Sequence, residues 1–219
     1  MKLLVDKVIH AYGGKEAIEH VKSAFIKGKI SALMPFGEGT SVIYFKIPRK
    51  LRVRIAYRDY TEERILNGHR GYEGTNTYPV PEVTGFRYLA IVYQYKSQDI
   101  SYSLLHDAYR LSDEGKGSVN GIPLEVIRLD DKEGPPMKIY IDLNNFRIVK
   151  ISGFFSMGGN ETSLSSEFGD FRKVGRTEFP FKLTNYAGGQ KVAETLIEQY
   201  KVNMDIDNSV FGPQSSLAR

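Results

Sequence analysis

The 219-residue sequence is 41% hydrophobic and 26% charged, and it contains no cysteine or tryptophan. This composition is typical of a globular chain long enough to fold without disulfides, and the lack of cysteine excludes a thiol nucleophile and a Cys-ligated metal. The net charge of +4 is compatible with an anionic partner or membrane surface but is too small to require one.

Two short helices are predicted at the N-terminus, over residues 3–12 and 15–21, because apolar residues recur there at helical spacing and a Gly-Gly pair separates them. The first residues resemble the start of a secretion signal, but Asp6 and Lys7 interrupt the apolar stretch. Two alternatives stay open: a cytoplasmic protein, or an envelope protein whose signal has been removed.

Strands follow the two helices. Residues 51–57 alternate most regularly, with Leu51, Val53 and Ile55 on one face and Arg52 and Arg54 on the other. Turn signals at 35–39 and at Asn67-Gly68 separate this region into hairpins. The predicted strands are 25–33, 40–47, 51–57, 58–66 and 71–75.

The middle of the chain changes from strand to helix. Phe86, Leu89, Ala90 and Tyr93 recur at helical spacing within 83–95. The apolar residues Tyr88, Ile91 and Val92 extend over the rest of the helix surface, so this helix is predicted to be buried or to cover an apolar surface. A second helix is predicted directly after it, from about Ile100 to Ala108.

Strands resume after residue 108, separated by turn signals such as Asn120-Gly121 and Gly188-Gly189. The predicted fold is a single α+β, mainly β domain over residues 1–219. It has an antiparallel sheet and a helical insertion at 83–108. The later predicted strands are 109–115, 122–129, 137–142, 146–155, 162–172, 181–187 and 191–203.

No pattern in the sequence predicts catalysis, a metal or a cofactor. His10, His20, His69 and His106 lack neighbouring ligands at metal-binding spacing. The glycine-rich stretch 115–121 lacks the features of a phosphate loop, and 205–209 lacks the glycine and closing glutamate of a calcium loop. The acidic pairs Glu62-Glu63 and Asp130-Asp131 are predicted to be solvated.

The one basic cluster admits a nucleic-acid alternative, because aromatic residues lie close to it in the sequence. The alternation of Arg52 and Arg54 with an apolar face favours instead the solvated side of an antiparallel sheet. Together with the modest net charge, this argues against a nucleic-acid partner. The cluster consists of Lys46, Arg49, Lys50, Arg52 and Arg54.

Short motifs spread over nearly the whole chain resemble the bacterial lipoprotein-localisation (LolA/LolB-like) superfamily of periplasmic lipoprotein carriers. A strand–Pro–strand hairpin runs from Gly37 through Pro48 to Leu51, and an Asn-Gly turn precedes an aromatic strand at 67–72. The other similar stretches are 140–142, 148–150, 168–172, 179–180 and 203–211.

The resemblance implies an unclosed β-barrel around a helical lid, a cavity for lipoprotein acyl chains, and a periplasmic or outer-membrane location. The family's lid-latching arginine aligns with Ile47, which departs from the pattern. The leading hypothesis is a non-enzymatic carrier of a lipoprotein acyl chain or other amphiphile, although the same lining residues would also suit a plain core. The predicted lining is Leu51, Val53, Ile55, Phe86, Leu89 and Tyr93.

Two other hypotheses stay open. An envelope scaffold or assembly module would bind a membrane or envelope protein partner, without lipid. An enzyme acting on a lipid or glycan would need convergent polar residues in a pocket.

Overall fold

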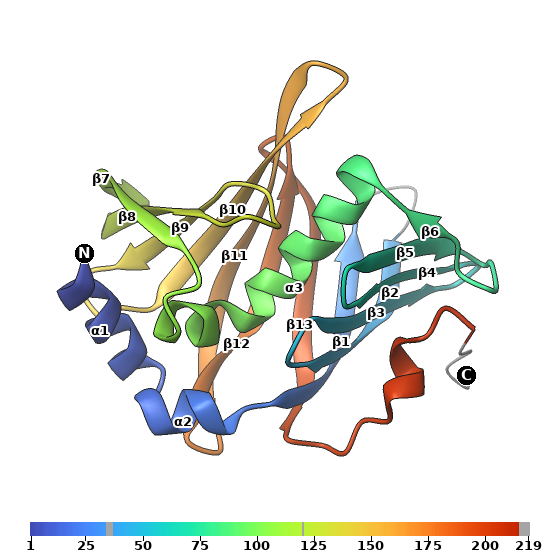
Figure 1. Ribbon diagram of the computed structural model, residues 1–219, viewed down its shortest axis with the longest axis horizontal. Coiled ribbons are helices and arrows are strands. Elements are labelled where there is room, and N and C mark those ends of the chain that lie inside the picture. Colours follow the sequence, from blue (N-terminus) through green and yellow to red (C-terminus); the bar gives the residue numbers. More distant parts are fainter. Residues whose placement is uncertain (34–36, 120, 215–219) are drawn as a thin grey trace. The chain divides into compact units, whose positions relative to one another are not determined.

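The computed structural model (Figure 1) describes residues 1–33, 37–119 and 121–214. The turn residues predicted at 35–36 and at 120 lie outside these ranges. The chain divides into two compact units. The first combines Met1–His20 with Asp99–Val192, and the second combines Val21–Gln98 with Ala193–Arg219.

Thirteen antiparallel strands form one sheet, in the order β6-β5-β4-β3-β2-β1-β13-β12-β11-β10-β9-β8-β7. Strands that follow one another in sequence are neighbours in the sheet, as short turns between antiparallel strands allow. The exception is β6 and β7, which form the two edges of the sheet, and the first strand, β1, pairs with the last, β13. The sheet is not closed, so the predicted mainly β, unclosed antiparallel architecture with a helical insertion is confirmed. The strands are β1 Ser23–Ala32, β2 Gly37–Lys46, β3 Lys50–Tyr57, β4 Thr61–Asn67, β5 Arg70–Thr75, β6 Glu82–Val83, β7 Arg110–Val119, β8 Ile122–Asp130, β9 Met137–Asp142, β10 Ile148–Met157, β11 Asn160–Val174, β12 Thr177–Ala187 and β13 Gln190–Val202.

The helices are α1 Lys2–Ala11, α2 Lys15–His20, α3 Gly85–Leu105 and the 3₁₀ helix η1 Asn208–Phe211. The prediction of two successive helices in the middle of the chain was wrong, because α3 runs without a break through Lys96–Asp99. No glycine or proline interrupts that stretch, and its Lys96 and Asp99 are themselves buried. Strand β6 and helix η1 were not predicted.

In the second unit, the first part of α3 packs on one face of the sheet. The ring of Tyr95 stacks on Phe45 of β2, with the ring centroids 5.4 Å apart. Tyr88 lies directly over Gly71 of β5, where an added Cβ would come within 2.8 Å of its ring. Gly71 therefore allows the helix to approach the strand closely.

The opposite face of the same strands is covered by the C-terminal segment, defined here as residues 203–214, which includes η1 (Figure 1). Phe211 is fully buried. The Nζ atom of Lys46 donates a hydrogen bond to the carbonyl of Ile206 at 2.9 Å, and Lys50 donates to Asn208 Oδ1 at 2.7 Å. Both faces of β3 are thus occupied by other parts of the chain.

This arrangement corrects two predictions about charge. Arg52 was predicted on the solvated side of the sheet but is fully buried, and Glu63 was predicted to be solvated but is only 2% exposed. The two side chains form an ion pair, and Arg52 Nη1 also donates to the carbonyl of Val210 at 2.9 Å. The C-terminal segment excludes water from a face that the alternation pattern alone assigns to solvent.

In the first unit, the N-terminal helical region contacts β10, β12 and the turn that precedes β12. The hydroxyl of Tyr12 accepts a hydrogen bond from the backbone N–H of Ile148 at 3.3 Å, and Thr177 donates to the carbonyl of Ala17 at 3.1 Å. Gly13, between the helices, has a φ of 105°. A Cβ there would lie 2.2 Å from the carbonyl oxygen of Arg176, so only glycine fits this contact.

Candidate functional site

Three of the six predicted lining residues lie together on β3. Leu51, Val53 and Ile55 alternate along the strand and share one face, and each is less than 9% exposed. Phe45 pairs with Leu51 across the sheet and stacks on Tyr95. The apolar face of β3 is therefore the face on which α3 packs.

The other three predicted residues lie together on α3. Tyr93 is buried, whereas Phe86 and Leu89 are half-buried. At about 3.6 residues per turn, these three lie on a different side of the helix from Tyr88 and Tyr95, which contact the sheet. The structure thus places the two sets within one unit, each on its own element, and their role as a ligand lining stays a prediction.

Arg49 connects the sheet to α3 at this apolar face. Its guanidinium group donates hydrogen bonds to the hydroxyl of Tyr88 at 3.2 Å and to the carbonyl of Gly68 at 3.0 Å. Its backbone N–H donates to the hydroxyl of Tyr95 at 3.0 Å. The family resemblance places the latching arginine at position 47, where this chain has isoleucine, yet an arginine two residues later makes the contact with the helix.

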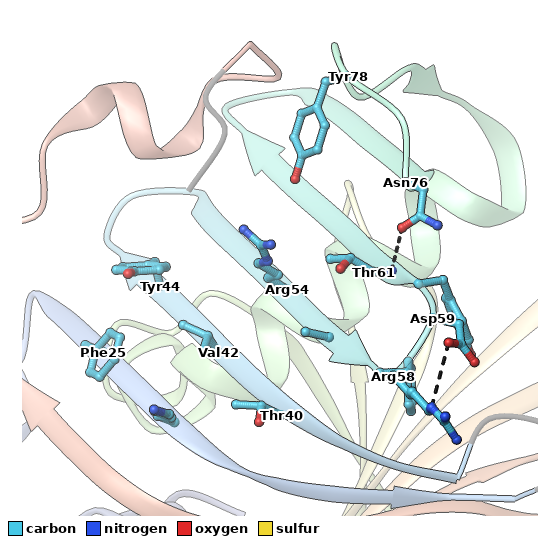
Figure 2. A pocket seen from close by; sticks show the side chains of 14 residues that line it. Phe25, Thr40, Val42, Tyr44, Arg54, Arg58, Asp59, Thr61, Asn76 and Tyr78 are labelled. Carbon is cyan, nitrogen blue, oxygen red and sulfur yellow. Dashed lines mark hydrogen bonds and ion pairs between the residues drawn. The ribbon is translucent and has the colours of Figure 1, made fainter. Parts of the chain in front are cut away.

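A second site, here called the outer pocket, lies elsewhere in the same unit (Figure 2). It has a volume of about 840 Å³ and is lined by 14 residues from β1–β4, the turn at 58–60 and the loop at 76–78. Two aromatic pairs stand in it: Phe25 with Tyr44, edge to face, and Tyr57 with Tyr60, stacked 4.8 Å apart. No pattern in the sequence predicts this pocket.

Burial favours the protonated form of Tyr57, Tyr60 and Tyr78, which line the outer pocket. It raises the pKa of Tyr57 to about 12, and the nearby negative charge of Glu62 adds to this shift. Burial also raises the pKa of Tyr60 and of Tyr78. The Tyr78 hydroxyl donates a hydrogen bond to the buried carboxylate of Glu63, and this bond raises the pKa of Tyr78 further.

The raised pKa of Tyr57 predicts a loss of stability in alkali. The neutral phenol is favoured in the folded chain, so its contribution is intact below about pH 10, the pKa of an unfolded tyrosine. It is lost as the pH rises through about 12. Urea unfolding measured across this range should show a smaller loss for Tyr57→Phe than for the wild type. Equal slopes would contradict the assignment, and Tyr140→Phe, which removes a tyrosine hydroxyl from β9 in the first unit, serves as the control.

The arrangement of the histidines and other metal-ligating side chains decides whether the chain meets the requirements of a metal site. All four histidines are exposed, and no group of three or more metal-ligating side chains occurs within the described ranges. Among those residues, no helix is long and apolar enough to cross a membrane.

The residues of the basic cluster contact different parts of the structure. Lys46, Lys50 and Arg52 bind the C-terminal segment, Arg49 contacts α3, and Arg54 lies in the outer pocket. A continuous phosphate-binding surface, as the nucleic-acid alternative requires, is not formed by this cluster.

The sequence matches no protein-family model and no curated protein. Solved structures do match. A LolA superfamily protein from Nitrosomonas europaea superposes with a TM-score of 0.60 at 13% identity, over 96% of each chain. A DUF1329 family protein from Desulfovibrio piger gives 0.58 at 11% identity, also over 96% of each chain.

A third match is a domain from Vibrio parahaemolyticus described as an outer membrane lipoprotein-sorting protein. Its TM-score is 0.52 at 10% identity, over 95% of this chain and 94% of that one. The similarity in all three cases extends over nearly the full length. The chain therefore has the LolA-like fold, and the resemblance predicted from its sequence motifs is confirmed at the level of the fold.

Proposed function

We propose that the protein is a non-enzymatic carrier of the bacterial cell envelope that binds the acyl chain of a lipoprotein or another amphiphile. The observation that carries the proposal is the packing of α3 on an apolar sheet face while its residues Ile91, Val92 and Tyr93 are all buried. Consecutive buried positions mean that the helix is covered on several sides, which is typical of a helix between apolar surfaces. The shared fold with a LolA superfamily protein supports the same role.

The energetics of such binding need only apolar lining. Each buried CH₂ contributes about 0.8 kcal/mol, so a long acyl chain binds without a catalytic or charged group. Leu51, Val53 and Ile55 would supply an apolar surface on the sheet. The half-buried Phe86 and Leu89, together with Tyr93, would supply a second apolar surface on the side of α3 that does not contact these strands. A carrier of this kind would act in the periplasm or at the outer membrane.

Arg49 has a defined place in this proposal. It joins the β2–β3 connection to Tyr88 and Tyr95 through side-chain and backbone hydrogen bonds. Movement of α3 away from the sheet would break both contacts. Arg49 would therefore hold α3 against the apolar face until a ligand displaces the helix.

The test is a direct search for bound lipid, followed by binding of a dansylated fatty acid. Organic extraction of the purified protein and mass spectrometry should recover acyl lipids. Leu89→Gln should weaken fatty-acid binding about tenfold, because a buried amide without a partner costs about 1–3 kcal/mol. Arg87→Gln introduces the same side chain at a largely exposed position of α3 and should leave binding unchanged.

Other outcomes would reject the carrier. No extracted lipid and no fatty-acid binding, combined with a protein partner recovered by crosslinking, would favour the scaffold alternative. Equal effects of Leu89→Gln and Arg87→Gln would show that α3 does not line the site.

A further inference from the structure

The outer pocket and the apolar face under α3 lie on opposite faces of the same strands. Tyr44 pairs with Phe25 of β1 and alternates with Phe45, which contacts α3. Because successive strand residues point to opposite faces, Val42 and Tyr44 on β2 and Arg54 on β3 point away from the helix. The outer pocket is thus separate from the apolar face of β3, where an acyl chain is proposed to bind (the acyl-chain surface).

The walls of the outer pocket present flat rings next to polar groups. The Phe25–Tyr44 pair stands at one end, and the turn that carries Arg58 and Asp59 at the other, with Arg54 between them (Figure 2). At the rim, the Asn76 side chain accepts a hydrogen bond from the backbone N–H of Thr61 at 2.7 Å, which fixes the loop against β4.

Positive charge gathers at the same place. Arg54, Arg58 and Lys27 line the pocket together with one acidic residue, Asp59. Arg54 lies 3.8 Å from the carboxylate of Glu63 and Arg58 lies 4.0 Å from that of Asp59, so both guanidinium charges are partly offset. The ammonium group of Lys27 is exposed and has no ion-pair partner within the ranges that the structure describes. On β13, Lys201 is paired in register with Phe25, so it adds a further cation on this face of the sheet.

We propose that the outer pocket binds a sugar ring that carries a phosphate or carboxylate group. Aromatic rings offer flat apolar contact to the C–H faces of a sugar, while their hydroxyls and the threonine side chains meet its polar edge. The cations favour an anionic substituent. An acyl chain fits poorly here, because it would leave the charged and hydroxyl groups desolvated without partners.

The pocket volume suits a small ligand, since binding sites for small molecules span about 300–1,000 Å³. Its concave shape favours a discrete sugar over a flat membrane surface. The ligand can be free, or it can be the head group of a lipid, and the experiment separates these two sources.

The first experiment titrates the purified chain with glucose 6-phosphate and with glucose, followed by calorimetry and by NMR shifts of the pocket residues. Glucose 6-phosphate should bind and shift residues of β1, β2 and β3 that line the pocket, and glucose should bind more weakly. Equal affinity for the two sugars would overturn the role of the cations.

Matched variants locate the binding. Lys27→Ala should weaken binding of glucose 6-phosphate about three- to fivefold, the effect of one exposed charge contact. Lys29→Ala lies on the same strand and face but is paired with Glu198 at 3.4 Å and is not part of the pocket lining, so it should have no effect. Ala56→Trp should fill the pocket floor and abolish binding, with an unchanged circular dichroism spectrum.

The lipid source is tested with phosphatidylcholine vesicles that contain or lack phosphatidylinositol. Binding of the free sugar phosphate alone assigns a free ligand, and binding only to vesicles with phosphatidylinositol assigns a lipid head group. Failure of both probes, or retention of binding by a folded Ala56→Trp variant, would overturn the proposal. Fatty-acid binding should be unaffected by all three variants, which keeps this site distinguishable from the carrier function.

Discussion

Replacing Arg52 with alanine is expected to lower the free energy of unfolding by about 3–5 kcal/mol, because it leaves the carboxylate of Glu63 buried without its main cation. Arg52 is fully buried, and Glu63 is 2% exposed. The change also removes the donor to the carbonyls of Val210 and Gly212. Urea unfolding at neutral pH measures the loss.

Two further variants make the Arg52 prediction specific. Arg58→Ala removes an arginine whose side chain is 94% exposed, and it should change stability by less than about 0.5 kcal/mol. Adding Glu63→Gln to Arg52→Ala removes the stranded charge and should recover part of the loss. A loss below about 1 kcal/mol in Arg52→Ala would contradict the burial of the pair.

Replacing Phe211 with alanine is expected to cost about 3–5 kcal/mol, the usual range for emptying a buried phenylalanine site. Its ring is fully buried where η1 contacts β3 and β4. Met204→Ala, in the same segment but 39% exposed, should have a much smaller effect. Denaturant unfolding again gives the comparison.

The Arg52 and Phe211 variants should be non-additive, because both act on the docking of the C-terminal segment. Once one substitution has released the segment, the second lowers the free energy of unfolding by less than it does alone. The free energy of unfolding of Phe211→Ala could instead equal that of the wild type while residues 203–214 exchange their amide hydrogens faster. In that case the segment opens locally rather than with the core.

Most strand positions and the fold class could be predicted from the sequence because the relevant signals are local. Alternation in β3 and turn residues between strands depend on neighbours a few positions away. The burial of Arg52 could not be predicted in this way, since its covering partner Val210 lies 158 residues further along the chain. The alternation pattern distinguishes the two faces of a strand but does not report that both are covered.

The candidate sites show the same limit. The apolar residues of β3 and α3 stand out by their spacing, so the acyl-chain surface could be proposed from sequence. The outer pocket could not, because Phe25 and Tyr44 become neighbours only through the register of β1 and β2. The contact of Arg49 with the helix could not be predicted either, because the family resemblance places the latching arginine at position 47 and Tyr88 lies 39 residues beyond Arg49.

The hydrogen bonds from Arg52 to the backbone of the C-terminal segment affect which substitutions the segment can accept. The guanidinium group holds main-chain carbonyls, and every amino acid supplies a carbonyl. The segment can therefore change its side chain at position 210 and remain docked, provided that the backbone keeps its path. Substitutions in the C-terminal segment would therefore be tolerated where only the backbone carbonyl is bound by Arg52. Substitutions of Arg52 and Phe211 would not be tolerated, because the docking of the segment depends on their side chains.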